Sequence, residues 1–363
     1  MTIQTHYHEG DHGTVARIVL DKPKALNALS TEMIVAVQAV LDEWKHNDRI
    51  KAVWIEGAGD KAFCAGGDVV MLYHSMQETA AGDIPEKAAE FFTLEYRLDY
   101  TIHTYDKPII IWADGIVMGG GLGIAVGGSH RIVTEKSMVA MPEVTIGLYP
   151  DVGASWFFQR MPGRTAEFLG MTGARMNAAD ALFTKLADHY LESENKADLL
   201  QALTALPFTD PHLEISETIT SLGESQVPVE SQLRRHFDVI NDLMKGQQLA
   251  DIVDSFKSLE TNEKWLGFAQ KAILSGCPMT LVLVQQQIQR AKHMSLKEVF
   301  QMELMVSTRC AMHDDLAEGI RALLIDKDGQ PQWSAQNVTD ISAAQVEEFF
   351  TPPWQGENPL TNL

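Results

Sequence analysis

The chain has 363 residues, of which 45% are hydrophobic and 21% are charged, so it carries enough apolar material for a sizeable core. Its formal net charge is -20, and a field of that sign repels nucleic acids and anionic membrane surfaces. No apolar run approaches the roughly 20 residues that span a bilayer, and the first residues resemble neither a signal nor a transit peptide. Three widely spaced cysteines indicate a reducing compartment. We therefore expect a cytoplasmic protein with no nucleic-acid or membrane partner.

Strand-like and helix-like segments alternate along the first 190 residues. Short apolar runs predict strands at 15–21, 50–57, 107–115 and 130–140. Between them, Ser30 is a suitable N-cap for a helix that ends near His46, and a second helix is expected at 85–103. This alternation predicts an α/β fold built from right-handed crossover units.

The character of the sequence changes after about residue 190. Turn signals and mixed polarity over residues 191–275 predict a linker with short helices. From Pro278 to about Leu324, apolar residues recur at helical spacing. We therefore divide the chain into a core at 1–190, a linker at 191–275 and a helical C-terminal subdomain and tail at 276–363.

Two glycine-rich segments offer backbone N–H groups to a negative charge. "MGGGLG" follows a predicted strand and opens a predicted helix, and "CAGGD" forms a second flexible loop. Two such groups that converge form an oxyanion hole, in which one donor is worth about 2.7–4 kcal/mol. The alternative is that these glycines only permit tight turns and close packing. A dinucleotide-binding fingerprint fits poorly, because its glycine register breaks at Ile124 and at Val126.

Two carboxylates, Glu143 and Asp151, lie in the otherwise apolar or small run "AMPEVTIGLYPDVGASWFF". An unpaired carboxylate in apolar surroundings is costly, so such a pair indicates a functional site. The alternative for Asp151 is an N-cap of a helix at 152–160. A third acid, Glu95, lies in the predicted helix at 85–103, where a solvated helix face is the ordinary interpretation.

Other candidate residues have simpler interpretations. His6, His8 and His12 lack supporting metal-ligand spacing and are interpreted as a frayed polar segment. No histidine motif supports Cys64 as a nucleophile, and Asp68 is interpreted as a cap of the helix that follows it.

Five segments together resemble the crotonase (enoyl-CoA hydratase/isomerase) superfamily. They are "PKALNALS", "KAFCAGGDV", "ADGIVMGGGLGIAVGGSHRI", "MPEVTIGLYPDVGASWFF" and "EGIRALLIDKDGQPQW". The resemblance implies an α/β crotonase (ClpP/crotonase-like) fold of repeated ββα units with a helical C-terminal subdomain. It implies an acyl-CoA substrate, no metal, and no cofactor apart from the CoA of the substrate itself. It also implies a possible homo-oligomer, a trimer or a hexamer.

The same resemblance assigns binding residues to the glycine-rich and lysine-containing loops. The oxyanion-hole donors are the backbone amides of Gly67 and Gly120. The CoA contacts are Lys24, Ala25, Leu26 and Ala65, and Lys24 also supplies a local positive charge in a very acidic chain.

The chain departs from the hydratases of this superfamily at one position. They use two glutamates around one water, and the first of these corresponds to Gly123 here, whereas the second corresponds to Glu143. The segment "MPEVTIGLYPDVG" instead resembles the 3-hydroxyisobutyryl-CoA hydrolase subfamily, in which the equivalents of Glu143 and Asp151 form the site and that of Glu95 contacts the polar end of the substrate. The implied reaction is hydrolysis of 3-hydroxyisobutyryl-CoA, and of 3-hydroxypropionyl-CoA as a further substrate, in valine catabolism.

The sequence leaves two questions about this reaction open. Glu143 can act as a general base towards water or attack the thioester directly. Asp151 can bind the 3-hydroxyl group, or it can position Glu143 and assist departure of the thiolate. Two alternatives to the hydrolase also remain: an isomerase- or hydratase-type crotonase that uses Glu143 alone, and a non-catalytic acyl-CoA binder.

Overall fold

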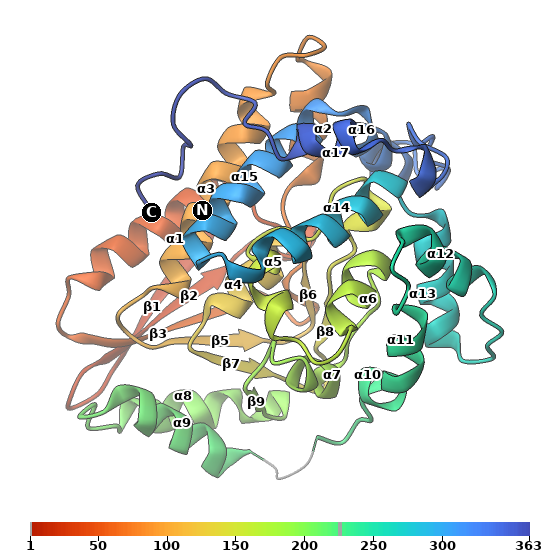
Figure 1. Ribbon diagram of the computed structural model, residues 1–363. Coiled ribbons are helices and arrows are strands. Elements are labelled where there is room, and N and C mark those ends of the chain that lie inside the picture. The colour runs from red at the N-terminus through yellow and green to blue at the C-terminus, as the bar shows by residue number, and fades with distance from the viewer. Residues whose placement is uncertain (1, 224–226) are drawn as a thin grey trace. The chain divides into compact units, whose positions relative to one another are not determined.

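The computed structural model describes residues 2–223 and 227–363, so residues 224–226 of the predicted linker lie outside it. The chain forms two compact units, each assembled from three separate segments. Figure 1 labels their helices and strands. Unit 1 comprises Met1–Gly67, Leu98–Val139 and Met176–Arg235; unit 2 comprises Asp68–Arg97, Ala140–Arg175 and His236–Leu363. The predicted division at residues 190 and 275 stays a prediction.

A six-stranded sheet forms the centre of unit 1. Its strand order is β1-β2-β3-β5-β7-β9, with bounds Ile3–Glu9, Thr14–Leu20, Ile50–Gly57, Ile109–Ala113, His130–Val133 and His189–Tyr190. The β1/β2 pair is antiparallel and the other pairs are parallel; Ile55, for example, lies opposite Ile111. All five residues of β5 are buried, as its continuous apolar run predicts. The α/β class and the predicted strands at 15–21, 50–57 and 107–115 are confirmed, whereas the run at 130–140 forms two strands that belong to different sheets.

A smaller sheet has the strand order β4-β6-β8, with bounds Ala62–Cys64, Ile116–Met118 and Met138–Ala140. Strands β4 and β6 are parallel, with Ala62 opposite Ile116 and Cys64 opposite Val117. The short helix α4 (Gly120–Gly127) follows β6 directly and is buried along its whole length. The prediction that "MGGGLG" connects a strand to a helix is therefore confirmed.

Helices complete unit 1. Helix α1 (Thr31–Lys45) begins after Ser30, whose side chain accepts a hydrogen bond from the amide of Met33, as predicted. Helices α8 (Lys196–Thr204) and α9 (Pro211–Leu222) contribute to one apolar cluster that also holds the stacked rings of Trp54 and Trp112. Helices α7 (Ala178–Phe183) and α10 (Gln232–Arg235) are joined by hydrogen bonds from Ser231 and Leu233 to Asp180.

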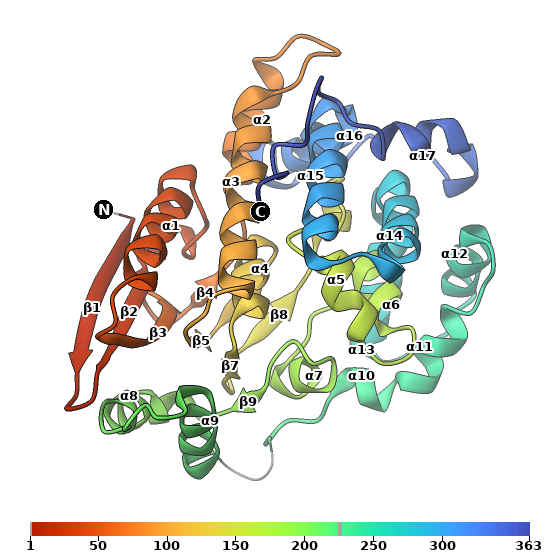
Figure 2. The same ribbon diagram turned by 60° about the vertical axis from the view of Figure 1, so that its left-hand side comes forward.

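Unit 2 is mainly helical (Figure 2). Its longer helices are α2 (Val69–Gln77), α3 (Glu86–His103, in this unit up to Arg97), α6 (Thr165–Thr172), α11 (Phe237–Leu243), α12 (Leu249–Lys257), α13 (Lys264–Ser275), α14 (Pro278–Arg290), α15 (Leu296–Met312), α16 (Asp314–Ile320) and α17 (Ala343–Phe349). Helix α15 packs against the four-residue helix α5 (Ala154–Phe157), and α14 packs against α6. Helix α2 starts at the predicted cap Asp68, which accepts a hydrogen bond from the amide of Met71.

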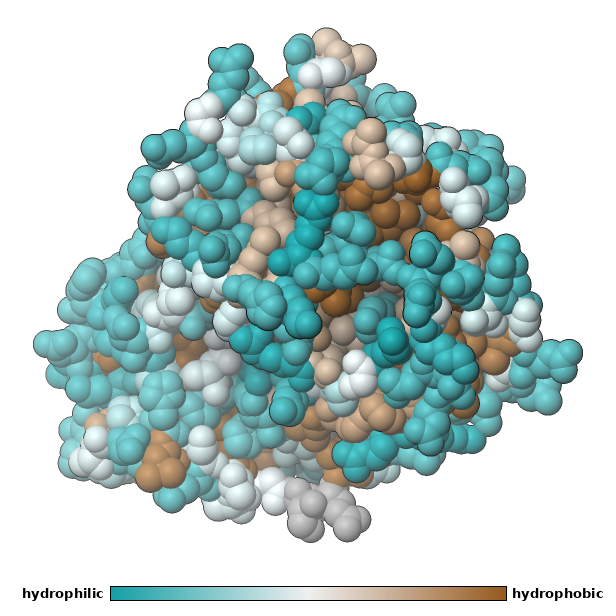
Figure 3. All heavy atoms as spheres, in the orientation of Figure 1, coloured by the Kyte–Doolittle hydropathy of each residue, from teal (hydrophilic) through white to brown (hydrophobic). Residues whose placement is uncertain are grey.

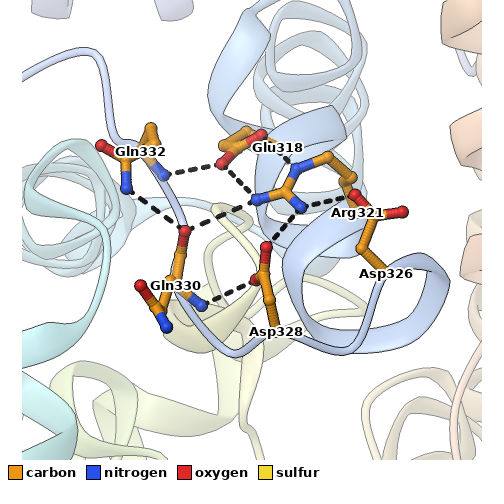
Figure 4. A network of polar contacts seen from close by, with 6 residues as sticks. All are labelled: Glu318, Arg321, Asp326, Asp328, Gln330 and Gln332. Carbon is orange, nitrogen blue, oxygen red and sulfur yellow. Dashed lines mark hydrogen bonds and ion pairs between the residues drawn. The ribbon is translucent and has the colours of Figure 1, made fainter.

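Short turns of helix connect these elements. The 3-10 turns are Pro23–Ala25, Glu143–Thr145, Phe158–Arg160, Ser193–Asn195, Ala291–His293 and Val338–Asp340, and a π-helical turn spans Arg321–Ile325. The first residue of the π turn is Arg321, and its guanidinium binds Glu318, Asp326 and Asp328 together with the carbonyl of Gln330 (Figure 4). This network holds the loop that follows α16 in one conformation.

Two of the N-terminal histidines belong to the larger sheet. His6 and His8 lie within strand β1, so the expectation of a frayed segment is wrong there: residues 3–9 are held in register by pairing with β2. The face drawn in Figure 3 is mostly hydrophilic, which agrees with the high net charge.

Within residues 2–223 and 227–363 no single helix is long and apolar enough to cross a membrane. The two helices Lys264–Ser275 and Pro278–His293, which are bent relative to each other, would be long and apolar enough only when taken together.

Candidate active site

Glu143 lies in a tight turn immediately after strand β8. The turn is closed by the carbonyl of Pro142, which accepts hydrogen bonds from the amide and the hydroxyl of Thr145. The Glu143 side chain is only 5% exposed, and among the described residues its Oε2 has no hydrogen-bond partner. Burial, and then the nearby charge of Asp151, raise the pKa of the Glu143 carboxyl well above its ordinary value. An oxygen that is buried without a partner is available to a substrate or a water molecule.

Close packing on the C-terminal helices fixes this turn in place. Gly147 has φ +75°, and a side chain there would overlap the backbone of Asp315. The carbonyl of Val144 accepts a hydrogen bond of 3.0 Å from the amide of Cys277. Glycine at 147 is therefore required both for its conformation and for the close approach of α16.

Asp151 ends the loop that follows this turn. Its side chain is 4% exposed, and its Oδ2 lies 2.5 Å from the Tyr96 hydroxyl. Burial raises the pKa of the Asp151 carboxyl to about 6, against the opposing effect of the hydrogen bond with Tyr96. Helix α5 begins only at Ala154, after Val152 and Gly153 have both adopted positive φ.

The interpretation of Asp151 as an N-cap is wrong, because the carboxylate of another acid binds the amides at the start of the helix. The amides of Gly153 and Ser155, at the start of α5, donate hydrogen bonds of 2.6 and 2.9 Å to the two carboxylate oxygens of Glu303. The N-cap residue itself is Gly153, and the predicted helix at 152–160 consists of α5 and a 3-10 turn. The Asp151 side chain is thereby left free of a capping role.

Glu95 belongs to the same group of buried acids. It lies on α3 and is 3% exposed, so the expectation of a solvated helix face is wrong: this face of α3 is covered in the folded unit. Burial raises the pKa of the Glu95 carboxyl well above its ordinary value, and the charges of Asp151 and Glu143 raise it further. The structure therefore brings together the three acids Glu95, Glu143 and Asp151, as the resemblance implies.

Helix α15 contributes two buried polar residues that sequence reasoning missed, Glu303 and Ser307. The Tyr149 hydroxyl donates a 2.9 Å hydrogen bond to the backbone carbonyl of Glu303, and it lies 3.0 Å from the hydroxyl of Ser307. The Ser307 hydroxyl lies 2.6 Å from that of Tyr96. Burial raises the pKa of the Glu303 carboxyl to about 8 despite its two amide donors. One sequence signal was present: Val299, Glu303 and Ser307 are spaced by four residues and share the buried side of the helix.

Helix α14 anchors the backbone between the two acids. The Thr280 hydroxyl donates to the carbonyl of Leu148 at 2.9 Å, and the Gln287 amide donates to the carbonyl of Pro150 at 3.0 Å. With the Tyr149 bond to α15, three successive residues of the loop are tied to the C-terminal helices. These helices thus determine where Glu143 and Asp151 lie.

In unit 1 the two glycine-rich loops lie side by side. A Cβ atom on Gly66 would lie 3.4 Å from the carbonyl oxygen of Met118, just before the turn into α4. Gly121 packs directly on Cys64, where a side chain would overlap the backbone of β4. Gly120 is the first residue of α4, so its amide has no acceptor within the helix. The loops of Gly67 and Gly120 are therefore neighbours, and their role as oxyanion donors stays a prediction.

The residues predicted to contact CoA surround a second loop of unit 1. Lys24 and Leu26 line a hollow of about 270 Å³, and Ala25 lies between them in the 3-10 turn. The amide of Ala65 donates a 3.0 Å hydrogen bond to the carbonyl of Leu26, which joins this loop to the CAGGD loop. The buried side chain of Asn27, which sequence reasoning missed, donates to the carbonyls of Ala58 and Ala62 and locks the hollow on its other side.

Several known proteins are similar to this chain over most of its length. The family model described as "Enoyl-CoA hydratase/isomerase" matches residues 15–350. Among curated relatives, the mitochondrial 3-hydroxyisobutyryl-CoA hydrolase of Gallus gallus is 35% identical over 96% of this chain and 89% of its own length. That of Homo sapiens is 34% identical over 93% and 86%.

Two solved structures share the fold closely. A carnitinyl-CoA dehydratase from Mycobacterium thermoresistibile has a TM-score of 0.87 and 31% identity, covering 100% of this chain and 99% of that one. An enoyl-CoA hydratase from Rhodobacter sphaeroides 2.4.1 has a TM-score of 0.84 and 31% identity, covering 96% and 97%. The predicted crotonase fold, with two sheets and C-terminal helices, is confirmed.

Proposed function

The chain belongs to the enoyl-CoA hydratase/isomerase (crotonase) family, and from that premise we propose that it hydrolyses the thioester of a short 3-hydroxyacyl-CoA. The proposed substrate is 3-hydroxyisobutyryl-CoA, with 3-hydroxypropionyl-CoA as a further substrate, and the products are the free 3-hydroxy acid and CoA. Valine catabolism is the proposed context. The similarity to hydrolases over nearly the whole chain supports this choice.

The observation that carries the proposal is the pairing of Glu143 with Asp151. Both carboxyl groups are buried, their pKa values are raised, and one oxygen of Glu143 lacks a partner among the described residues. Helix α4 supplies no second glutamate, because Gly123 stands at the position where a hydratase has one. A site with this composition is better suited to a thioester than to the addition of water to an alkene.

The proposal gives each residue a role. The amides of Gly67 and Gly120 bind the thioester oxygen as negative charge develops on it. Glu143 either removes a proton from water, which then attacks the carbonyl carbon, or attacks that carbon itself to form a mixed anhydride that water cleaves. In both routes the carbon–sulfur bond breaks and the thiolate of CoA takes up one proton. Asp151 and Glu95 are assigned to the polar end of the acyl group.

A second candidate is suggested by the names of the two similar structures, a dehydratase and a hydratase. In this alternative, Glu143 alone transfers a proton at the alkene or at the carbon next to the thioester. The chain keeps that glutamate, so the chemistry is accessible without Asp151.

One pair of assays separates these candidates. Purified protein is given 3-hydroxyisobutyryl-CoA while free thiol is followed, and crotonyl-CoA while the alkene absorbance is followed. We expect thiol release that collapses in both Glu143→Gln and Asp151→Asn. The exposed Glu260→Gln is the matched control and should retain full activity. A change in alkene absorbance without thiol release would instead establish the second candidate, and CoA binding without either signal would indicate a non-catalytic binder.

Location and assembly are further proposals. We propose a cytoplasmic protein, although the curated relatives are named mitochondrial, and cell fractionation tests this directly. A homotrimer or homohexamer is proposed by family resemblance, and sedimentation measures it.

A further inference from the structure

Four contacts link Asp151 to helix α15 through hydroxyl groups. Oδ2 of Asp151 lies 2.5 Å from the Tyr96 hydroxyl, which lies 2.6 Å from that of Ser307. Ser307 lies 3.0 Å from the Tyr149 hydroxyl, which lies 2.9 Å from the carbonyl oxygen of Glu303. All five residues are buried. We refer to Asp151, Tyr96, Ser307, Tyr149 and the Glu303 carbonyl as the hydroxyl chain.

The number of hydrogens in this chain is fixed by its chemistry. Each of the three hydroxyls carries one hydrogen, and a backbone carbonyl can only accept. Tyr149 must therefore donate to Glu303, which obliges Ser307 to donate to Tyr149 and Tyr96 to donate to Ser307. The fourth contact then has a hydrogen only if Asp151 supplies it. A protonated Asp151 thus completes all four hydrogen bonds.

An ionised Asp151 leaves the chain one hydrogen short. Its Oδ2 can only accept, so Tyr96 must donate to it, and three hydrogens must serve four contacts. One contact then joins two oxygen atoms with no hydrogen between them. In a buried site, water cannot easily compensate for a hydrogen bond that is not made.

Among the described residues, none of the groups that face Asp151 carries a positive charge. They are Glu95 and Tyr96 on α3, Glu143 in its 3-10 turn, Tyr149 in the loop, and Glu303 and Cys310 on α15. The hydrogen bond that Tyr96 can donate favours the ionised form of Asp151, but each of these groups carries either no charge or a negative one, so their charges do not. Burial adds to this, since it raises the pKa of Asp151.

We propose that Asp151 carries a proton on Oδ2 in the resting protein, and that Tyr96, Ser307 and Tyr149 are positioning residues that keep it there. The consequence for the reaction rests on the proposed function. Oδ1 of a neutral Asp151 accepts a hydrogen bond from the 3-hydroxyl group of the substrate. Glu143 can then ionise beside an uncharged neighbour and act as the base or nucleophile.

The test measures the protonation of Asp151 without any substrate. The infrared C=O stretching band of its carboxylic acid is followed against pH and assigned by its loss in Asp151→Asn. In the wild type we expect this band to persist well above the ordinary aspartate range. Ser307→Ala and Tyr149→Phe, neither of which removes a group that touches Asp151, should each lower its pKa. The expected shift is about one pH unit, a tenfold change in the protonation equilibrium and the size expected for one hydrogen bond.

The direction of each shift distinguishes this proposal from a simple loss of packing. Without Ser307 or Tyr149, the remaining hydroxyls can satisfy every contact while Tyr96 donates to an ionised Asp151. Tyr96→Phe removes that donor and should instead raise the pKa of Asp151. Thr308→Ala removes an equally buried hydroxyl from the same helix, which bonds only to the carbonyl of Leu304, and should leave the pKa unchanged.

Two results would overturn the proposal: a band already lost in the ordinary aspartate range in the wild type, or unchanged pKa values in both Ser307→Ala and Tyr149→Phe. Neither result depends on the activity. If the infrared shifts occur but no thiol is released from 3-hydroxyisobutyryl-CoA, the hydroxyl chain stands and the proposed function fails. Thiol release without the shifts would mean that the proposed function stands and the protonated hydroxyl chain fails.

Discussion

Each unit of the molecule buries a glutamate, Glu56 in unit 1 and Glu143 in unit 2, but the two side chains have very different partners. In unit 1, Glu56 on β3 is 2% exposed, and both of its oxygens have partners. Oε1 binds Arg17 and Lys196, and Oε2 accepts a 2.8 Å hydrogen bond from the indole of Trp54. In unit 2, Glu143 is 5% exposed, one of its oxygens lacks a partner among the described residues, and its charged neighbours are acids.

Burial alone therefore does not distinguish a structural acid from a functional one. The partners do. A buried carboxylate with two cations and an indole N–H is compensated by the protein itself, so it has no need of a ligand. A buried carboxyl group with an open oxygen and acidic neighbours is destabilising until a substrate or water engages it. Such uncompensated groups are typical of active sites.

Glu143→Gln should produce the largest effect that separates the two acids. Loss of the base or nucleophile should lower kcat for thiol release by about 10²–10⁴-fold. Stability should stay equal or rise, because the change removes a buried carboxyl group with unfavourable neighbours. Thiol-release kinetics and thermal melting check both halves, and a large drop in melting temperature would show that Glu143 is structural instead.

Glu56→Gln should give the reverse result. The neutral amide cannot form ion pairs with Arg17 and Lys196, so we expect a loss of about 1–3 kcal/mol in unfolding free energy. The loss stays in this range because both cations keep some solvent exposure. The kcat should stay within about twofold of the wild type, since Glu56 is not assigned to the site. Chemical denaturation and the thiol assay measure this pair of quantities. If activity fell as much as in Glu143→Gln, the hydrogen-bond and ion-pair partners of a buried acid would not distinguish a structural acid from a functional one.

The four buried acids of unit 2 should make the stability of the protein depend on pH. The folded protein raises the pKa values of Glu95, Glu143, Asp151 and Glu303, to about 6 for Asp151 and about 8 for Glu303. Above the ordinary carboxyl range, the folded state therefore binds more protons than the unfolded state, and stability falls as pH rises towards about 8. Glu143→Gln should make this fall shallower, by at most about 1.4 kcal/mol per pH unit for one group. Melting temperatures of both proteins, measured across this pH range, test the prediction. Equal slopes of stability against pH in the two proteins would show that Glu143 does not have a raised pKa.

Lys24→Ala should have the smallest effect. Lys24 is exposed beside the hollow of unit 1, so its attraction to the phosphates of CoA is screened by solvent. We expect KM for the acyl-CoA to rise roughly 2–5-fold at unchanged kcat, with the difference shrinking at high salt. Lys185→Ala, which removes an exposed lysine outside that hollow, is the matched control. If KM changed neither with the substitution nor with the salt concentration, Lys24 would not be part of the CoA site.

Local signals in the sequence were sufficient for much of the fold. The continuous apolar run of β5, the N-cap Ser30 and the cap Asp68 all act over a few residues, and each is confirmed. The Glu143 and Asp151 pair was visible because two acids interrupt an apolar stretch.

What the sequence could not provide were contacts between distant segments. An aspartate just before a helix is a good local indication of a cap, but Glu303, 150 residues away, takes the helix amides instead. The contact between Tyr96 and Ser307 spans 211 residues, and no local pattern predicts it. The burial of Glu95 could not be predicted for the same reason, since the burial of a helix face depends on what packs against it.

The bonds from the last third of the chain to the loop of Glu143 and Asp151 have a consequence for synthesis on the ribosome. Thr280, Gln287 and Glu303 bind residues 132, 137 and 150 positions earlier. At 5–20 residues per second, this loop waits roughly 8–30 s for its supports to be made. During that interval its acids have no fixed geometry. The nascent chain should therefore remain inactive until α15 has emerged, however well its N-terminal sheet has already folded.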